Sequence, residues 1–386
     1  MRIVWIGDKK MAKGAIGQVN VDPRSLKYLV PKTLHFNMMI PDVNVRDASI
    51  IKQEMLSKGG DAAISKDCYN LKTKKSDVLI TGSLSNFEEL TKKLRVQPIK
   101  SVKNIGDEIS EGIKNYLARK PRKTGIMGIL NVTPDSFWDG NKYLHKDDAI
   151  RRAKDMEAEG ADIIDVGGES TRPGHKPIVA KEERGRVIPV IKDLKREIEI
   201  PLSIDTTKPE IAKEALDLGV EIVNDQWGLQ KEGRDNEAFA GLISDYGASV
   251  VLMYNKNNTV HKDLIREILD FLRNGIAIAE NAGIENKNII LDPGIGFGKS
   301  AEQDLEVLAK FEELRVLGKP IMVGASRKSI IGKTLGLGPP EERLGPSIAI
   351  AAYAASLGAS LVRVHDVKET LRAVRMIDAI LEARYG

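Results

Sequence analysis

The sequence predicts an α/β protein in which a (β/α)8 barrel of the TIM type follows a small α/β N-terminal domain. Three observations support this fold class. Eight short apolar runs occur after residue 123, helical stretches with an apolar stripe separate several of them, and a basic segment with Pro and Gly, residues 117–125, precedes the first run. Near-continuous apolar runs are typical of parallel strands that are buried on both faces.

Each apolar run is an expected strand of the barrel. The runs are Ile126–Val132, Ala161–Val166, Pro201–Ile204, Glu221–Val223, Ser249–Met253, Asn288–Leu291, Pro320–Val323 and Ser360–Val364. Helices are expected at Asp147–Glu159, Lys208–Leu218, Glu302–Leu317 and Glu369–Ala383. Eight strand–helix units in about 260 residues fit such a barrel. A doubly wound open sheet is the alternative, but it should show a Gly-rich turn after its first strand, and residues 131–135 contain no Gly.

We place the domain boundary near residue 120, which gives an N-terminal domain at residues 1–120 and a barrel domain at residues 121–386. In the first domain, Asp77–Thr81 reads as a strand. A helix is expected to follow as far as Leu94, with Ser85 and Asn86 as its cap and Glu88 completing a capping box. The residues suggest no role for this domain.

Composition limits the class of protein. The chain has 386 residues, of which 42% are hydrophobic and 30% charged, and this ordinary globular composition excludes disorder or coiled coil for the whole chain. One cysteine, Cys68, excludes an intrachain disulfide framework. The first ten residues lack the pattern of a signal peptide, and the weakly polar run 346–362 is too short and too polar to span a membrane. We therefore expect a cytoplasmic protein.

Charge is distributed unevenly along the chain. Residues 1–122 hold 23 Lys and Arg against 13 Asp and Glu, whereas residues 123–386 hold 36 against 42. The basic residues of the first part are scattered, with few aromatic residues among them. We interpret them as solvated surface or as a docking face for the acidic part, with a weaker alternative of attracting anions, and we expect no nucleic-acid partner and no membrane partner.

Polar side chains end seven of the eight expected strands. In a barrel of this kind, chemistry takes place at the C-terminal ends of the strands. Single positions can be helix caps, but a whole ring of such residues predicts a polar site, because unpaired buried charges are costly. The residues are Asn131, Asp165, Asp205, Asn224, Asp225, Asp292, Ser326, Arg327, Lys328, Arg363 and His365.

The chemistry of these residues suggests a phosphorylated substrate with a polar ring. Arg363 and His365, together with Lys328, predict an oxyanion site, because Arg forms a bidentate fork and Lys a point charge. Carboxylates and an amide suit the edge of a heterocycle and a hard cation such as Mg²⁺ better than zinc. The run Gly294–Ser300 is not a nucleotide P-loop, because Pro293 stands where that motif requires Gly. It lets the backbone approach a flat ligand, or it makes a tight turn.

Seven segments, in order over residues 124–386, resemble the motif series of the dihydropteroate synthase family. They are Gly128–Phe137, Ile164–Gly174, Ser203–Thr206, Val223–Asp225, Leu291–Gly294, Ser326–Lys328 and Arg363–Asp366. The resemblance implies a transferase that joins 6-hydroxymethyl-7,8-dihydropterin diphosphate to p-aminobenzoate and releases pyrophosphate, through a dihydropterin cation. It also implies Mg²⁺ as cofactor, a homodimer, and a long form of the family with an N-terminal extension.

The resemblance also assigns roles to residues. It implies catalytic roles for Asp135, Lys328 and Arg172. The pterin would bind to Asp205, Asn224, Met253, Asp292, Phe297 and Lys328. The diphosphate would bind to Asn131, Arg363 and His365, with Asn131 also contacting the metal. The p-aminobenzoate would bind to Thr133, Pro134, Ser136, Phe137, Thr171, Pro173 and Ser329.

Departures from the family pattern keep alternatives open, chiefly for the acceptor. The stretch Leu252–Asn255 replaces a Met-His-Met-like sequence, Trp138 stands where a small residue is common, and Gly345–Ser347 replaces a usual Gly-Thr. A ribosylated p-aminobenzoate phosphate is the alternative acceptor. A pterin-dependent methyltransferase and a non-catalytic pterin-binding protein are weaker alternatives. The helix expected at Ile348–Leu357 and the terminal helix form a dimer face or pack on the barrel.

Overall fold

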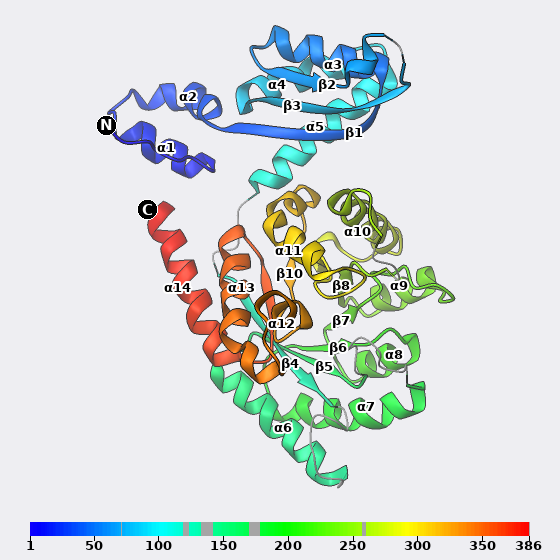
Figure 1. Cartoon of the computed structure of the whole chain (residues 1–386). Coiled ribbons are helices and arrows are strands. Elements are labelled where there is room, and N and C mark those ends of the chain that lie inside the picture. The colour runs from blue at the N-terminus through cyan, green and yellow to red at the C-terminus, as the bar shows by residue number, and fades with distance from the viewer. Residues whose placement is uncertain (71, 119–122, 133–141, 170–177, 257–259, 386) are drawn as a thin grey trace. The chain divides into compact units, whose positions relative to one another are not determined.

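A computed structural model of the chain describes residues 1–70, 72–118, 123–132, 142–169, 178–256 and 260–385, and of residues 142–145, 384 and 385 it describes the backbone alone. The chain divides into two compact units (Figure 1). One consists of residues 1–119 with residues 382–386, and the other of residues 120–381.

The N-terminal unit is a three-stranded antiparallel sheet with helices. Its strands, in the order β1-β3-β2, are β1 (His35–Asn44), β2 (Asp61–Ile64) and β3 (Lys75–Ser83). Its helices are α1 (Lys9–Gly17), α2 (Leu26–Thr33), α3 (Val45–Ser57), α4 (Leu84–Val96) and α5 (Lys100–Leu117), with short 3-10 turns η1 (Pro23–Ser25) and η2 (Lys66–Cys68). This confirms a small α/β unit before the barrel, with the expected strand inside β3 and the expected helix inside α4.

One face of this sheet forms the core of the unit. Val78 and Ile80 of β3 are fully buried in a cluster with side chains of α3, α4 and α5, whereas Leu79 between them is exposed. The cap predicted for the following helix is wrong by two residues. Ser83 caps α4, since its hydroxyl accepts a hydrogen bond from the amide of Asn86 and the Asn86 side chain accepts one from the Ser83 amide. Ser83 ends a strand, so its backbone already has the extended conformation of a cap.

The second unit is a barrel of parallel strands. The sheet order is β10-β11-β4-β5-β6-β7-β8-β9, and a parallel bridge between Leu291 and Ile321 brings the two ends of this order together. Each of the eight expected runs overlaps a strand. The strands are β4 (Gly125–Asn131), β5 (Ile163–Gly167), β6 (Leu202–Asp205), β7 (Ile222–Asp225), β8 (Ser249–Met253), β9 (Ile289–Asp292), β10 (Met322–Val323) and β11 (Leu361–Val364).

Helices surround the strands, as Figure 1 shows. They are α6 (Lys142–Glu159), α7 (Ala180–Glu197), α8 (Pro209–Asp217), α9 (Asn236–Asp245), α10 (Leu264–Asn281), α11 (Ala301–Ala309), α12 (Ser329–Leu335), α13 (Leu344–Leu357) and α14 (Val367–Tyr385), with 3-10 turns η4 (Asn286–Asn288), η5 (Phe311–Leu317) and η6 (Pro340–Arg343). The prediction of a single helix over Glu302–Leu317 is wrong. It breaks at Lys310 and continues as η5, which buries Phe311 and Leu314, three residues apart, on one side.

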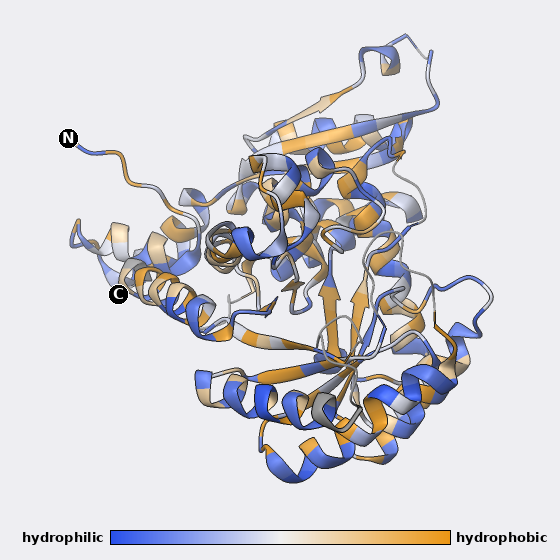
Figure 2. Ribbon diagram, turned by 60° about the horizontal axis from the view of Figure 1, so that its bottom comes forward, coloured by the Kyte–Doolittle hydropathy of each residue, from blue (hydrophilic) through white to orange (hydrophobic). Residues whose placement is uncertain are grey.

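Alternate residues of the barrel strands face opposite sides. Val250 and Leu252 of β8 pack in the large cluster that includes the helices, whereas Val251 belongs to a separate cluster to which five strands contribute one buried side chain each. This second cluster therefore fills the inside of the barrel. Figure 2 shows the hydrophobic colour of the barrel strands against the mixed colour of the helices. Among the described residues, no helix is long and apolar enough to cross a membrane.

Candidate active site

The inward-facing side of the strands turns from apolar to polar toward their C-terminal ends. The inner apolar cluster includes Met127, Ile222, Val251, Met322 and Leu361. Side chains two or four residues further along a strand point to the same side. These positions are occupied by Asn131, Asn224, Met253, Gly324 and Arg363. By the same alternation, Asp165, Asp205 and Asp292 face inward, so the structure brings together most of the described residues that the sequence predicted for the site.

Arg363 of β11 is the centre of this polar layer. Its Nε donates a hydrogen bond to Asp165 Oδ2 over 2.6 Å, and its Nη2 donates one to Asp205 Oδ2 over 2.8 Å. Asn224 Nδ2 also donates to Asp165 Oδ2, at 3.0 Å. Gln226 Nε2 donates to the other oxygen of Asp205, at 2.7 Å. Asp165, which the sequence placed in the polar ring but to which the resemblance assigned no role, therefore orients two residues with assigned roles.

Burial dominates the electrostatics of the carboxyl groups. It raises the pKa of Asp205 to about 7, although the charge of Arg363 opposes this shift. Burial also raises the pKa of Asp292, with Lys328 opposing it. Asp292 Oδ1 accepts a hydrogen bond of 2.7 Å from the Gly294 amide. The layer therefore holds one carboxyl group, that of Asp205, which can exchange a proton near neutral pH, next to a guanidinium group that stays charged.

Lys328 lies against the Gly-rich loop that follows β9. Its Nζ donates a hydrogen bond of 2.6 Å to the carbonyl of Ile295 and lies 4.5 Å from the centre of the Phe297 ring. A Cβ on Gly296 would come within 3.1 Å of the Lys328 side chain, so this Gly allows the close approach. Burial lowers the pKa of Lys328 to about 8, against the attraction of Asp292. The loop therefore contacts Lys328, the lysine that was predicted to bind the pterin.

Lys299 organises the same loop from inside, and the sequence analysis assigned it no role. Its ammonium group donates hydrogen bonds to the carbonyls of Pro293, Gly294 and Phe297, at 3.2, 2.7 and 2.7 Å. The nearest carboxylate oxygen, Asp304 Oδ1, is 3.9 Å away. Its side chain is fully buried, and burial lowers its pKa to about 8. A lysine that follows closely spaced glycines in a loop is the one signal that could have indicated this role.

His365 lies just after β11. Its Nδ1 is 3.0 Å from the hydroxyl oxygen of Ser326, and its backbone amide donates to the same oxygen at 3.2 Å. Burial lowers the pKa of His365 to about 4, and the charge of Arg363 adds to this shift, so the ring is neutral at pH 7. The contact with Ser326 connects the turn after β11 to the turn after β10.

The stretch that departs from the family pattern packs behind the Gly-rich loop. Tyr254 is fully buried, and its hydroxyl is 3.5 Å from His261 Nδ1. His261 Nε2 lies 2.9 Å from the carbonyl oxygen of Gly298, and its Nδ1 lies 3.0 Å from Glu267 Oε2. These contacts connect the segment after β8 to the loop after β9. Met253, which precedes Tyr254, is buried at the C-terminal end of β8.

The remaining predicted residues belong to the acceptor site and the two loops. Ser329 is exposed at the first position of α12. The others lie outside the described residues. They are Thr133, Pro134, Asp135, Ser136, Phe137, Thr171, Arg172 and Pro173, and Trp138 lies with them.

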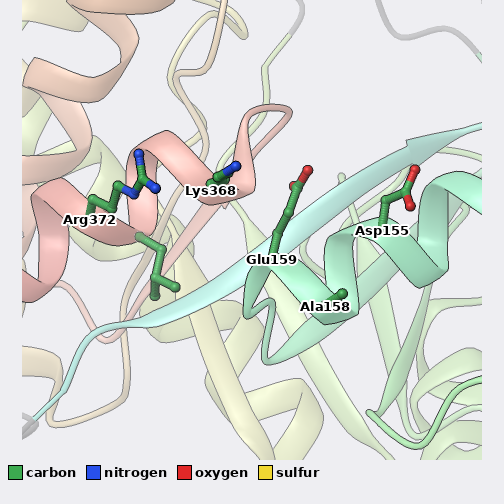
Figure 3. A pocket seen from close by; sticks show the side chains of 6 residues that line it. Asp155, Ala158, Glu159, Lys368 and Arg372 are labelled. Carbon is green, nitrogen blue, oxygen red and sulfur yellow. The ribbon is translucent and has the colours of Figure 1, made fainter.

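A surface cavity lies away from this layer, between α6 and α14 (Figure 3). It has a volume of about 420 Å³, and no predicted site residue lines it. Two acidic residues of α6, Asp155 and Glu159, face two basic residues of α14, Lys368 and Arg372. Because these charges offset each other on outer helices, we do not assign the substrate to this cavity.

Fold and site together define a class of protein. A closed set of eight parallel strands whose C-terminal ends carry buried carboxylates, an arginine and a lysine is a barrel enzyme with a pocket for a charged, polar small molecule. Comparison with known protein families identifies the family of this enzyme. Residues 127–365 match the model of a family described as pterin binding enzyme, and the chain belongs to this family.

Known relatives are similar over the barrel and, in one case, over nearly the whole chain. A dihydropteroate synthase of Clostridium beijerinckii is 47% identical over 67% of this chain and 95% of its own length. A probable bifunctional folylpolyglutamate synthase/dihydropteroate synthase of Halobacterium salinarum is 35% identical over 95% of this chain and 46% of its own length. A crystal structure of dihydropteroate synthase from Clostridium difficile in the presence of pteroic acid has 52% identity and a TM-score of 0.65, and the match covers 68% of this chain and 98% of that one.

Proposed function

We propose that the chain joins 6-hydroxymethyl-7,8-dihydropterin diphosphate to p-aminobenzoate, giving 7,8-dihydropteroate and pyrophosphate. One observation carries this proposal. The polar layer of Asp165, Asp205, Asn224 and Arg363 lies at the C-terminal ends of the strands in a chain 47% identical to a dihydropteroate synthase.

The pterin half of the donor would bind at the centre of the layer. A pterin ring has an edge of alternating donors and acceptors, which the carboxyl groups of Asp205 and Asp292 and the amide of Asn224 complement. Lys328 can donate to a ring acceptor if its ammonium group turns from the Ile295 carbonyl toward the ring. Met253 and Phe297 offer apolar surface to the faces of the ring.

The diphosphate would bind to Asn131, Arg363 and His365. For Mg²⁺ we propose Asn131 as the protein ligand, and its Oδ1 lies 3.6 Å from the position that a Cβ on Gly167 would take, a position without a side chain. Mg²⁺ commonly uses one or two protein oxygens and substrate phosphates. When bound, it would neutralise charge on the leaving diphosphate.

The reaction needs little acid–base chemistry from the protein. The C–O bond of the donor breaks, and its electron pair leaves with the diphosphate. The amine nitrogen of the acceptor then forms the C–N bond and loses a proton. Arg363 stabilises the departing charge, and the buried carboxyl group of Asp205 stabilises the cationic ring. For Asp135 we propose that its carboxylate stabilises the dihydropterin cation, and we propose Arg172 as a further catalytic residue.

Pyrophosphate release tests the proposal. The purified chain, with Mg²⁺ and the pterin diphosphate, should release pyrophosphate when p-aminobenzoate is added, and Lys328→Ala should reduce kcat/KM at least about 100-fold. Lys310→Ala, which removes a surface partner of Glu306, is the matched control and should keep full activity. Release only with the ribosylated p-aminobenzoate phosphate would move the acceptor to the alternative, and no release with either acceptor would refute the proposal.

We further propose a homodimer formed by the last two helices. Tyr353 of α13 and Met376 and Ile380 of α14 are exposed apolar side chains, and Ala351, Ala354 and Ala355 of α13 pack inward. Sedimentation analysis of the wild type and of Met376→Glu should show a dimer and a monomer, respectively. A wild type that sediments as a monomer would refute this assembly.

A further inference from the structure

The turn between β10 and α12 has an unusual backbone conformation. Arg327 has a φ of +57°, in the left-handed region that residues with a side chain rarely adopt. Such a conformation is strained and persists only where surrounding contacts hold it. Lys328 follows directly and is the cap residue of α12, so the strained residue determines where the Lys328 side chain begins.

Both backbone polar groups of Arg327 are held by the start of α13. Its amide donates a hydrogen bond of 2.8 Å to Ser347 Oγ, and its carbonyl accepts one of 3.0 Å from Arg343 Nη1. The Ser347 hydroxyl in turn donates to the Arg343 carbonyl over 2.6 Å. These contacts fix the peptide groups on both sides of the Arg327 Cα, and they supply the constraint that the strain requires.

The Arg327 side chain joins this turn to the turn after β11. Nε and Nη2 donate to the two carboxylate oxygens of Asp366 at 2.8 and 2.7 Å, and Nη1 donates to the Pro340 carbonyl at 3.0 Å. Asp366 follows His365, just as Lys328 follows Arg327. A second contact, between Ser326 and His365, runs parallel to the first. Lys328 and His365 therefore project from two turns that are tied together twice.

We propose that Arg327 is a positioning residue whose left-handed conformation directs Lys328 and fixes its place relative to His365. The inference rests on the proposed function, in which Lys328 holds the pterin and His365 the diphosphate of one donor molecule. Each of the three guanidinium nitrogens of Arg327 donates to a protein acceptor, so we assign the side chain to holding the turn. It acts by matching the spacing of two subsites to the two ends of the donor.

Comparison of Arg327→Ala with Arg327→Gly separates this role from others. Both substitutions remove the guanidinium group, but only Ala is strained at a φ of +57°, since Gly adopts that conformation readily. We expect Arg327→Ala to lower kcat/KM for the pterin diphosphate strongly and Arg327→Gly to be at least about fivefold more active than Arg327→Ala. Equal activity of the two variants, or a less active Gly variant, would overturn the proposal.

Further measurements keep the test decisive. A merely structural role would lower the melting temperature of both variants and leave the kcat and KM of the folded fraction unchanged, which would also overturn the proposal. Arg273→Ala, which removes an exposed pair with Asp270, is the control and should match the wild type. If neither Arg327 variant folds, Ser347→Ala decides: reduced kcat/KM with the fold intact supports the proposal, and wild-type kcat/KM overturns it.

Pteroic acid binding distinguishes failure of this inference from failure of the proposed function. If the wild type binds pteroic acid but releases no pyrophosphate, the proposed function is wrong, and the affinities of the variants for pteroic acid still test the inference. The same order is then expected, with Arg327→Gly binding more tightly than Arg327→Ala. Identical affinities would overturn the inference in that case as well.

Discussion

Arg363 Nε donates a hydrogen bond of 2.6 Å to Asp165 Oδ2, which joins β11 to β5 across a chain separation of 198 residues. The Asp165 side chain is fully buried, and the Arg363 side chain is 15% exposed. A buried pair of this kind fixes orientation more than it adds stability, because both charges have lost their water. The pair therefore fixes the orientation of the guanidinium group, to which the proposed function assigns the diphosphate.

We expect Asp165→Asn to uncouple Arg363 from this orientation. Arg363 and Asn224 both donate to Asp165 Oδ2, so the amide oxygen of Asn can still accept both hydrogen bonds, but the negative charge that attracts Arg363 is lost. Removing one charge of a buried pair costs about 3 kcal/mol of unfolding free energy. Chemical denaturation should show this loss, and kcat/KM should fall about 10- to 100-fold. Asp270→Asn on α10 is the exposed control, and equal effects of the two substitutions would contradict the role of Asp165.

The raised pKa of Asp205 predicts a pH-dependent effect on stability. Its folded pKa of about 7 exceeds the ordinary value of 3.8, so between these values the folded state binds a proton that the unfolded state has lost. The contribution of Asp205 to stability therefore decreases as pH rises from about 4 to about 7 and stays low above that range. The unfolding free energy of Asp205→Asn minus that of the wild type should therefore be larger at pH 8 than at pH 5. Urea denaturation at both pH values measures this, and a stability difference that does not change with pH would show that Asp205 is not the group responsible.

Lys299→Met should destabilise the Gly-rich loop. Methionine fills a similar volume, but it leaves the carbonyls of Pro293, Gly294 and Phe297 without their donor. A buried group without its hydrogen-bond partner costs about 1–3 kcal/mol, so we expect a loss of about 3 kcal/mol in denaturation. Lys287→Met, at an exposed pair with Glu285, should change stability by less than about 0.5 kcal/mol. A Lys299→Met variant as stable as this control would mean that the carbonyls find other donors.

Gly294→Ala tests the close approach between the loop and the chain after β8. Gly294 has a φ of +66°, and a Cβ there would collide with the Tyr254 carbonyl oxygen. Gly233 has a similar φ of +73° with open space around it. Both substitutions carry the backbone penalty, so the difference between them isolates the collision. We expect Gly294→Ala to be about 3 kcal/mol less stable than Gly233→Ala by thermal denaturation. Similar losses would show that the two segments move apart at little cost.

The barrel and its polar layer could be predicted because they follow from short-range patterns. Buried parallel strands are apolar on both faces, so each strand stands out as a run such as Ser249–Met253, which the structure reproduces without change. The position of polar side chains at the strand ends then follows from the fold. Asp205, Asn224 and Arg363 were placed together on this basis, and hydrogen bonds connect all three to one cluster.

Which side chains form hydrogen bonds with one another inside the polar layer could not be predicted from the sequence. Nothing in local spacing shows that Arg363 pairs with Asp165 and Asp205, because these contacts depend on side-chain reach across the barrel. The same holds for Lys299, whose partners are backbone carbonyls that carry no sequence signal. The left-handed Arg327 is held by Ser347 and Arg343, residues that are local to it in space and distant in sequence. The helix cap at Ser83 was missed for a simpler reason, because two serines lie two positions apart.

The place of β11 in the sheet has a consequence for biosynthesis. β11 is the last strand of the barrel to be made, yet it pairs with β4, the first, with Val362 opposite Ile126, and with β10 on its other side. A chain that stops before Leu361 therefore leaves two strand edges open, and open edges pair with other chains. Premature termination before β11 should yield aggregation-prone fragments instead of weakly active enzyme, because the ring can close only after β11 has been made.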